Sequence, residues 1–160
     1  MANRLMQGTW QWIQPTHEMR DEVLALLSDA DLAFSPGGSN MKLGELIREW
    51  GEIEHAYTEG FKTFKQDFDY RHPDPTIATS SDRLKTWLKA LDADMAATVE
   101  AYTDAEVDSK PIMRPGDYPA AIDMQINIYL QALLIFLSKL TVFLRAANKP
   151  LPPAIVDWIG

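Results

Sequence analysis

The last long helix predicted for this chain, over residues 118–148, constrains the fold more than any other feature. Apolar side chains cover almost its whole circumference, and its polar side is a narrow stripe of Asn127, Gln131, Ser138 and Arg145. A bundle helix with one buried face normally shows a wider polar arc. We therefore expect this helix to be buried on several sides, either as the central helix of its own bundle or against a second copy of the chain.

Other segments also carry the apolar repeat of amphipathic helices. They cover residues 5–13, 16–30, 42–65 and 81–102, with Pro15 expected to interrupt between the first two. Residues 103–117 are polar and predict a long loop, and signals for β-strands are nearly missing. Four long helices joined by connectors of moderate length predict an all-α fold, a four-helix bundle, in a single domain spanning residues 1–160.

Composition excludes several classes of function. The net charge is −8 and the 15 basic residues form no run, which argues against nucleic-acid binding. The chain has no cysteine, which excludes disulfides and thiolate chemistry and suits the reducing cytoplasm, where we expect the protein to act. The amino-terminal residues do not have the pattern of a secretory signal. The apolar run 128–144 is short and too polar for a transmembrane helix, so we expect no membrane insertion.

Two segments carry a resemblance to a known family. Leu43-Gly44-Glu45-Leu46-Ile47-Arg48, followed by Glu52-Ile53-Glu54-His55-Ala56-Tyr57, resembles the second helix of the DinB/YfiT-like superfamily. Residues 142–152 resemble the last helix of that family and its proline-containing ending. The resemblance covers nearly all of the chain. It implies a four-helix bundle with an up-down-down-up arrangement, commonly homodimeric, in which many members hold a divalent metal on three histidines and some are thiol-dependent transferases or isomerases.

The resemblance also implies where the metal ligands would lie. By position they would fall at Glu49, Ala132 and Phe136, and none of the three is a histidine. Alanine and phenylalanine offer no lone pair to an ion. We therefore expect that the family's metal site has been lost and that the protein needs no metal and no cofactor.

Glu49 could still coordinate a hard cation, because carboxylates suit Mg²⁺, Ca²⁺ or Mn²⁺. Such a site would need further oxygen ligands, for which Gln125 is the nearest candidate and Glu52 a weaker one. The interpretation favoured by the sequence is a solvated glutamate at the edge of the apolar face, since most glutamates are exposed.

Glu54 falls near the middle of the buried face of its predicted helix. A carboxylate in that position must pair with a cation or take up a proton. We expect a bridge to another helix through an arginine such as Arg20 or Arg83, rather than a catalytic role. The three histidines of the chain share no helical spacing, so the sequence shows no histidine metal cluster.

Three hypotheses about function follow, and we favour the first. It is a metal-free, non-enzymatic DinB-like domain whose old metal site persists as an apolar pocket for a small apolar ligand. Ala132 would leave room there, Phe136 would form a wall, and Glu49, Gln125 and Tyr129 would orient the ligand. The second is a metal-dependent transferase or hydrolase with a rearranged carboxylate site. The third is an interaction module with its cavity packed shut.

The apolar surplus of the last helix predicts a homodimer. Leu134, Ile135 and Val142 are the residues expected in the contact between two copies. After this helix, Ile155, Trp158 and Ile159 form an apolar tail that we expect to fold back onto the bundle.

Overall fold

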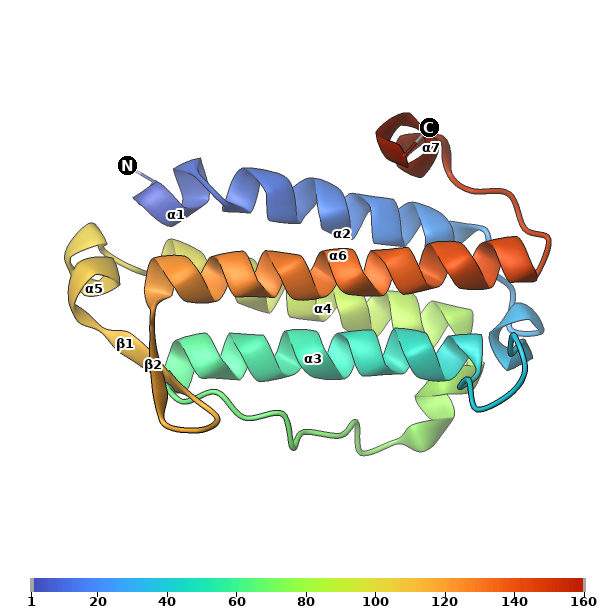
Figure 1. Ribbon diagram of the computed structural model, residues 1–160, viewed down its shortest axis with the longest axis horizontal. Coiled ribbons are helices and arrows are strands. Elements are labelled where there is room, and N and C mark those ends of the chain that lie inside the picture. The colour runs from blue at the N-terminus through green and yellow to red at the C-terminus, as the bar shows by residue number, and fades with distance from the viewer. Residues whose placement is uncertain (1, 160) are drawn as a thin grey trace.

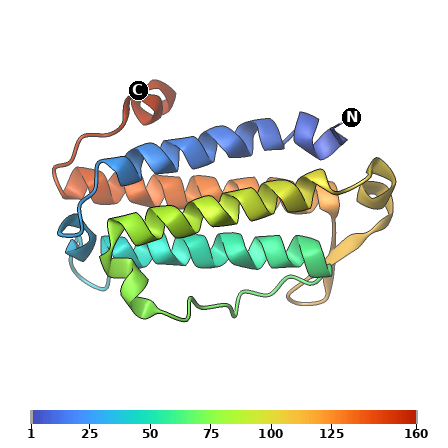
Figure 2. The same ribbon diagram turned by 180° about the vertical axis from the view of Figure 1, so that it is seen from behind.

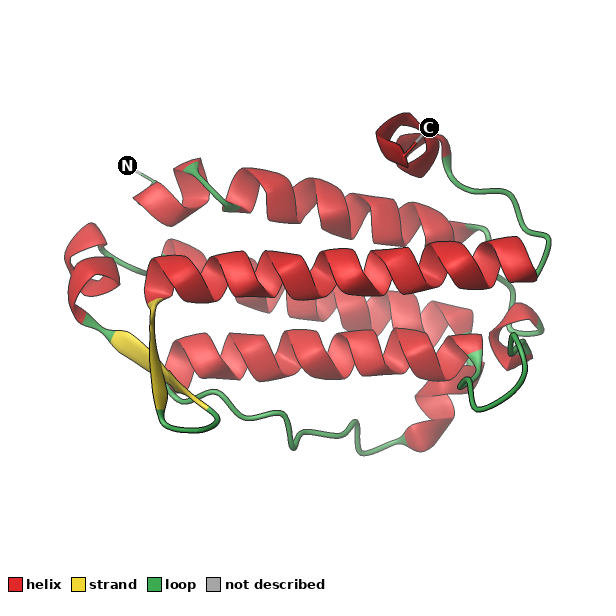
Figure 3. Cartoon of the chain, viewed as in Figure 1, coloured by secondary structure: helices red, strands yellow, loops and turns green. Residues whose placement is uncertain are grey.

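A computed structural model describes residues 2–159 of the chain, and it is mostly helical (Figure 3). The four longest helices are α2 (Trp10–Ala25), α3 (Leu43–Thr63), α4 (Ser81–Glu100) and α6 (Ile122–Ala146). Helix α2 contacts α4 and α6, and α3 contacts the same two helices. Helices α2 and α6 run in one direction and α3 and α4 run in the other (Figures 1 and 2). The all-α prediction is confirmed, apart from one short hairpin.

Helix α3 forms where its sequence repeats apolar residues at helical spacing. Leu43, Leu46, Ile47 and Trp50 are almost fully buried and face the core between the four helices. At the start of the helix the Glu45 carboxylate accepts the Lys42 backbone N–H at 2.8 Å. At its end Phe64 adopts a left-handed conformation with φ of 59°. The apolar repeat determines which face of α3 is buried, and the two ends determine where the helix starts and stops. Together they set the positions of the polar side chains of α3 that are described below.

Pro15 does not interrupt a helix, contrary to the expectation. The chain breaks earlier, between α1 (Arg4–Gln7) and α2, and Pro15 lies inside α2. A proline within a helix removes the hydrogen bond to the carbonyl four residues before it. That carbonyl belongs to Gln11, which is exposed, so water can replace the missing donor.

Residues 103–117 are not a plain loop. They contain α5 (Asp104–Ser109) and strand β1 (Pro111–Arg114), which pairs in antiparallel fashion with β2 (Tyr118–Ala121). The end of α3 holds the hairpin, because the Met113 backbone donates to the Phe64 carbonyl at 2.9 Å and accepts from the Gln66 N–H at 2.7 Å. Residues 118–121 belong to this pairing, so the last long helix begins at Ile122 rather than Tyr118.

Helix α6 is long and apolar enough, by length and composition, to cross a membrane. The core helix of a folded domain passes the same test, and α6 lies against α2 and α3 with its inner side chains buried. Its outer side is different: Leu134, Ile135 and Val142 are 43%, 58% and 62% exposed. The described chain therefore leaves an apolar strip of α6 uncovered.

Short elements close the ends of the fold. They are η1 (Asp31–Ala33), η2 (Pro75–Thr79) and the carboxyl-terminal α7 (Pro153–Ile159). Helix α7 folds back as expected, with Ile155 buried and the Trp158 ring edge-to-face with Trp12 at 6.1 Å. Trp158 and Ile159 are nevertheless mostly exposed, so Ile155 is the main anchor.

Candidate functional site

A buried ionic cluster occupies the space between α2, α3 and α4. Glu54 is only 1% exposed, and it pairs with Arg20, as the sequence predicted. The fully buried Arg20 guanidinium donates from Nη1 to Glu54 Oε1 at 2.9 Å. It also donates to both carboxylate oxygens of Asp92, at 3.0 and 2.6 Å. Arg83, the alternative partner, pairs instead with Asp74.

His17 extends this cluster to α6. Its Nδ1 lies 3.2 Å from Asp92 Oδ1, and its Nε2 lies 3.0 Å from the Tyr129 hydroxyl. These contacts fit a neutral ring that donates from Nδ1 to Asp92 and accepts the Tyr129 hydroxyl proton at Nε2. Burial, together with the charge of Arg20, lowers the pKa of His17 to about 3. His17 is therefore a neutral link between two helices at ordinary pH.

The cluster carries more negative than positive groups. Asp21, Glu54 and Asp92 all pair with Arg20, while Glu54 Oε2 is buried without a hydrogen-bond partner. Burial raises the pKa of Glu54 to about 8, although Arg20 and the Trp50 indole N–H stabilise its ionised form. Taking up a proton at Glu54 would relieve the excess charge, and the raised pKa brings that protonation closer to neutral pH.

Within residues 2–159, one group of three potential metal ligands converges, and it consists of His17, Glu54 and Asp92. One ligand atom from each lies within 4.8 Å of the others. The Arg20 guanidinium, however, already donates to both carboxylates, and Tyr129 is within hydrogen-bond distance of the histidine. The cation of this cluster is thus Arg20, and the donor set as arranged does not fit a metal ion. Sequence spacing missed the group because its members lie on three different helices.

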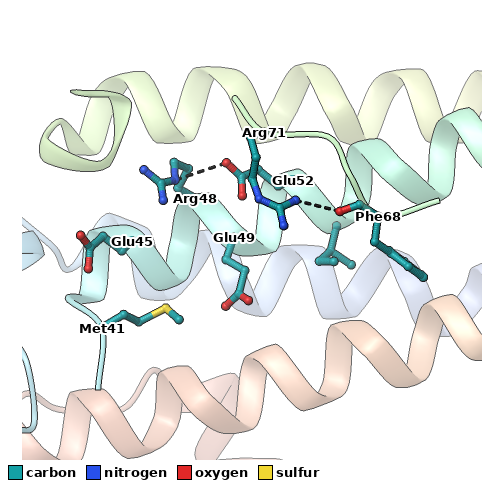
Figure 4. A pocket seen from close by; sticks show the side chains of 8 residues that line it. Met41, Glu45, Arg48, Glu49, Glu52, Phe68 and Arg71 are labelled. Carbon is teal, nitrogen blue, oxygen red and sulfur yellow. Dashed lines mark hydrogen bonds and ion pairs between the residues drawn. The ribbon is translucent and has the colours of Figure 1, made fainter. Parts of the chain in front are cut away.

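A cavity of about 290 Å³ lies beside the first half of α3 (Figure 4). Its wall is built from α3, from Met41 just before that helix, and from the segment between α3 and η2, residues 64–74, which we call the connector. The lining residues are Met41, Glu45, Arg48, Glu49, Glu52, Ile53, Phe68 and Arg71. We call this cavity the Glu49 pocket. Charged and apolar side chains are mixed in it, in contrast to the apolar pocket expected from the sequence.

Glu49 is the carboxylate of this pocket that has no hydrogen bond or ion pair among the described residues. It is half-buried and extends from α3 toward α6 (Figure 4), and its Oε2 is shielded from water without a hydrogen-bond partner. The neighbouring acids are engaged: Glu52 accepts the His72 N–H at 3.0 Å and pairs with Arg48 at 3.3 Å, and Glu45 accepts the Lys42 N–H. The expected solvated glutamate is thus only half right, because one oxygen is removed from water.

Arg71 brings a positive charge to the same pocket from the connector. Its Nη1 donates to the carbonyls of Phe68 at 2.8 Å and Tyr70 at 2.6 Å, which braces the connector. The adjacent Tyr70 ring stacks on His55 of α3, with centroids 3.8 Å apart. The wall opposite α3 is therefore held in place by contacts within the chain.

The other residues expected around Glu49 lie elsewhere. Gln125 is fully buried, donates to Gln66 Oε1 at 2.7 Å and accepts from Arg114 at 2.7 Å. Tyr129 contacts His17, and the ring of Phe136 packs on Trp50 with centroids 5.7 Å apart. Ala132 packs against the core. None of these four residues lines the Glu49 pocket, so the structure does not gather the expected site around Glu49.

Sequence comparison assigns no family to the chain. Neither the models of known protein families nor the curated protein sequences give a match. In the Glu49 pocket, the Glu49 carboxylate has no ion pair or hydrogen bond among the described residues, and the Arg71 guanidinium is hydrogen-bonded to the protein through Nη1 alone.

Proposed function

We propose that this protein is a small-molecule-binding module and that the Glu49 pocket is its binding site. The observation that carries this proposal is the Glu49 carboxylate, which lines a cavity while one of its oxygens is buried without a donor. A polar atom removed from water without a partner costs about 1–3 kcal/mol. A bound molecule that donates a hydrogen bond to this carboxylate can recover part of that free energy.

Binding is favoured over metal-dependent catalysis by the state of the neighbouring acids. A carboxylate metal site needs several oxygen ligands that converge on one ion. Glu45 and Glu52 are held by backbone N–H groups and by Arg48, and Gln125 is hydrogen-bonded elsewhere. Glu49 is therefore left without the additional oxygen ligands that the rearranged metal site would require.

The family assignment is part of this proposal. We infer a divergent, cytoplasmic DinB/YfiT-like four-helix bundle without the metal-binding histidines. The opposed directions of α2 and α6 against α3 and α4 support the up-down-down-up arrangement (Figure 1). The two segments that resemble the family lie on α3 and across the end of α6.

A screen of small polar fragments by protein-observed NMR tests the binding proposal. We expect fragments with hydrogen-bond donors to shift the backbone amide signals of residues 45–53 and 68–71. Glu49→Gln should weaken the best fragment about tenfold, because a hydrogen bond to a charged group contributes about 1.5 kcal/mol or more. Glu22→Gln, at an exposed glutamate on α2, is the matched control and should leave binding unchanged. If no fragment shifts these signals, the pocket is not a binding site.

A second role is favoured by a separate observation. The strip of α6 formed by Leu134, Ile135 and Val142 is exposed although its residues are apolar. Contiguous exposed apolar surface often marks an interaction site. We propose that two copies of the chain associate through this strip, which would place the two Glu49 pockets in one dimer.

A further inference from the structure

We propose that the ligand of the Glu49 pocket is a zwitterion of amino-acid size with an apolar side chain. This inference rests on the proposed binding function and adds the chemical class of the ligand. In the bound state the ligand's ammonium group contacts Glu49, its carboxylate contacts Arg71, and its apolar part packs on the pocket wall.

The first argument is the pair of opposite charges that line one cavity without pairing. Glu49 comes from α3 and Arg71 from the connector after α3, and Figure 4 shows their charged ends apart. Within the described residues no ion pair joins them. The hydrogen bonds of Arg71 to the protein all come from Nη1, so Nη2 and Nε remain as donors for an anion. A guanidinium and a carboxylate that face one cavity complement a molecule that carries both charges.

The remaining charges of the pocket have an opposite charge or a backbone donor beside them, although Arg48 Nε, like Glu49 Oε2, is buried without a hydrogen bond among the described residues. Arg48 and Glu52 form an i,i+4 pair at 3.3 Å, and Glu52 is almost fully buried. Glu45 accepts the backbone N–H at the start of α3. A ligand with a single charge would satisfy Glu49 or Arg71 and would repel the other group or leave it unmatched. Electrostatic complementarity therefore selects against simple amines and simple carboxylates.

Size and wall chemistry limit the rest of the ligand. A volume of about 290 Å³ lies just below the usual range for ligand pockets, about 300–1,000 Å³. The apolar part of the lining comes from Met41, Ile53 and Phe68. These side chains provide a surface for an aliphatic group, so a branched aliphatic amino acid fits better than glycine or a long chain.

Three matched compounds test the proposal on the unmodified protein by isothermal titration calorimetry. They are L-leucine, isoamylamine, which lacks the carboxylate, and isocaproate, which lacks the ammonium group. We expect leucine to bind at least about tenfold more tightly than either analogue, because each analogue leaves one charged group unmatched. Equal or tighter binding of an analogue would overturn the zwitterion proposal.

Two variants assign the contacts. Glu49→Gln should weaken the binding of leucine and isoamylamine but not that of isocaproate, whereas Arg71→Gln should weaken the binding of leucine and isocaproate but not that of isoamylamine. Glu22→Gln and Arg145→Gln, at exposed positions on α2 and α6, are the controls. Fragments that bind at residues 45–53 without this pattern would overturn the ligand class and leave the binding function intact. Absence of any fragment binding there would overturn both proposals.

Discussion

At the scale of single residues, two glutamates of α3 differ in their surroundings, since Glu54 is almost fully buried and Glu49 is half-buried. Glu54 contacts Arg20, Trp50 and His17 through one oxygen, and its raised pKa allows a proton to neutralise it. Glu49 has no such neighbours within residues 2–159 and lies at the wall of a cavity. The same residue type on one helix is thus held by an ion pair at Glu54, whereas at Glu49 one carboxylate oxygen has no hydrogen-bond partner among the described residues.

Two of the groups in the cluster whose pKa is shifted, His17 and Glu54, predict an unusual dependence of stability on pH. Folding lowers the pKa of His17 from 6.5 to about 3, so the unfolded chain binds more protons and stability falls as the pH drops below 6.5. Folding raises the pKa of Glu54 from 4.5 to about 8, so the folded chain binds more protons and stability falls as the pH rises from 4.5 to 8. Each effect has a slope of about 1.4 kcal/mol per pH unit. The free energy of unfolding should therefore be level between pH 4.5 and 6.5 and decline on both sides.

Urea unfolding across this pH range measures the effect. Glu54→Gln removes the titrating carboxyl, so its stability should stay level from pH 6.5 to 8 while the wild-type protein becomes less stable. Carboxylates with lowered pKa, such as Asp31 and Glu106, add to the decline at acid pH in both proteins. A wild-type curve that is level above pH 6.5 would contradict the raised pKa of Glu54.

At the scale of elements, α3 owes its position to a close approach of backbones. A Cβ atom placed on Gly44 would lie 1.9 Å from the carbonyl oxygen of Ala78, in η2. Glycine is therefore required here because η2 lies directly against the first turn of α3. Since that turn also carries Glu45, this contact helps to set one edge of the Glu49 pocket.

Gly44→Ala should destabilise the protein, although alanine is the better helix former. In an open helix the change would stabilise by about 1 kcal/mol, whereas forced overpacking costs about 1–3 kcal/mol. Urea unfolding should show a net loss of stability, and Glu22→Ala, at an exposed position on α2, should stay within about 0.5 kcal/mol of the wild type. A gain in stability for Gly44→Ala would mean that η2 moves away freely.

At the scale of the whole molecule, the apolar strip of α6 predicts self-association. Sedimentation velocity over a range of concentrations should show a dimer. A double change, Ile135→Glu with Val142→Glu, should give a monomer because it places charges on the contact. Met113→Glu alters an exposed apolar residue of β1 and is the control that should remain dimeric. Each chain has a net charge of −8, so added salt should strengthen the dimer by screening repulsion. A wild-type protein that stays monomeric at all concentrations would contradict the proposal.

The sequence by itself determined where the long helices lie and that Glu54 needs a charged partner or a proton. Apolar periodicity located α3, α4 and α6, and it located α2 as two separate segments, because a 3.6-residue repeat depends only on local geometry and on the need to bury one face. The same repeat placed Glu54 on a buried face, where a carboxylate must find a cation or a proton, and Arg20 is that partner. The limits of α2 were not predicted correctly. Pro15 is tolerated inside this helix because the carbonyl that it leaves without a backbone donor faces water.

Only the tertiary structure decided the hairpin and the site. Strands β1 and β2 are four residues each, too short for a clear alternation, and β1 is held by the backbone at the end of α3. The Glu49 pocket depends on which donors other segments bring to each acid, and on a connector that places Arg71 opposite α3. Those contacts join residues far apart in sequence. Local spacing therefore located Glu49 on its helix, but only the packed chain showed that its carboxylate lacks a partner.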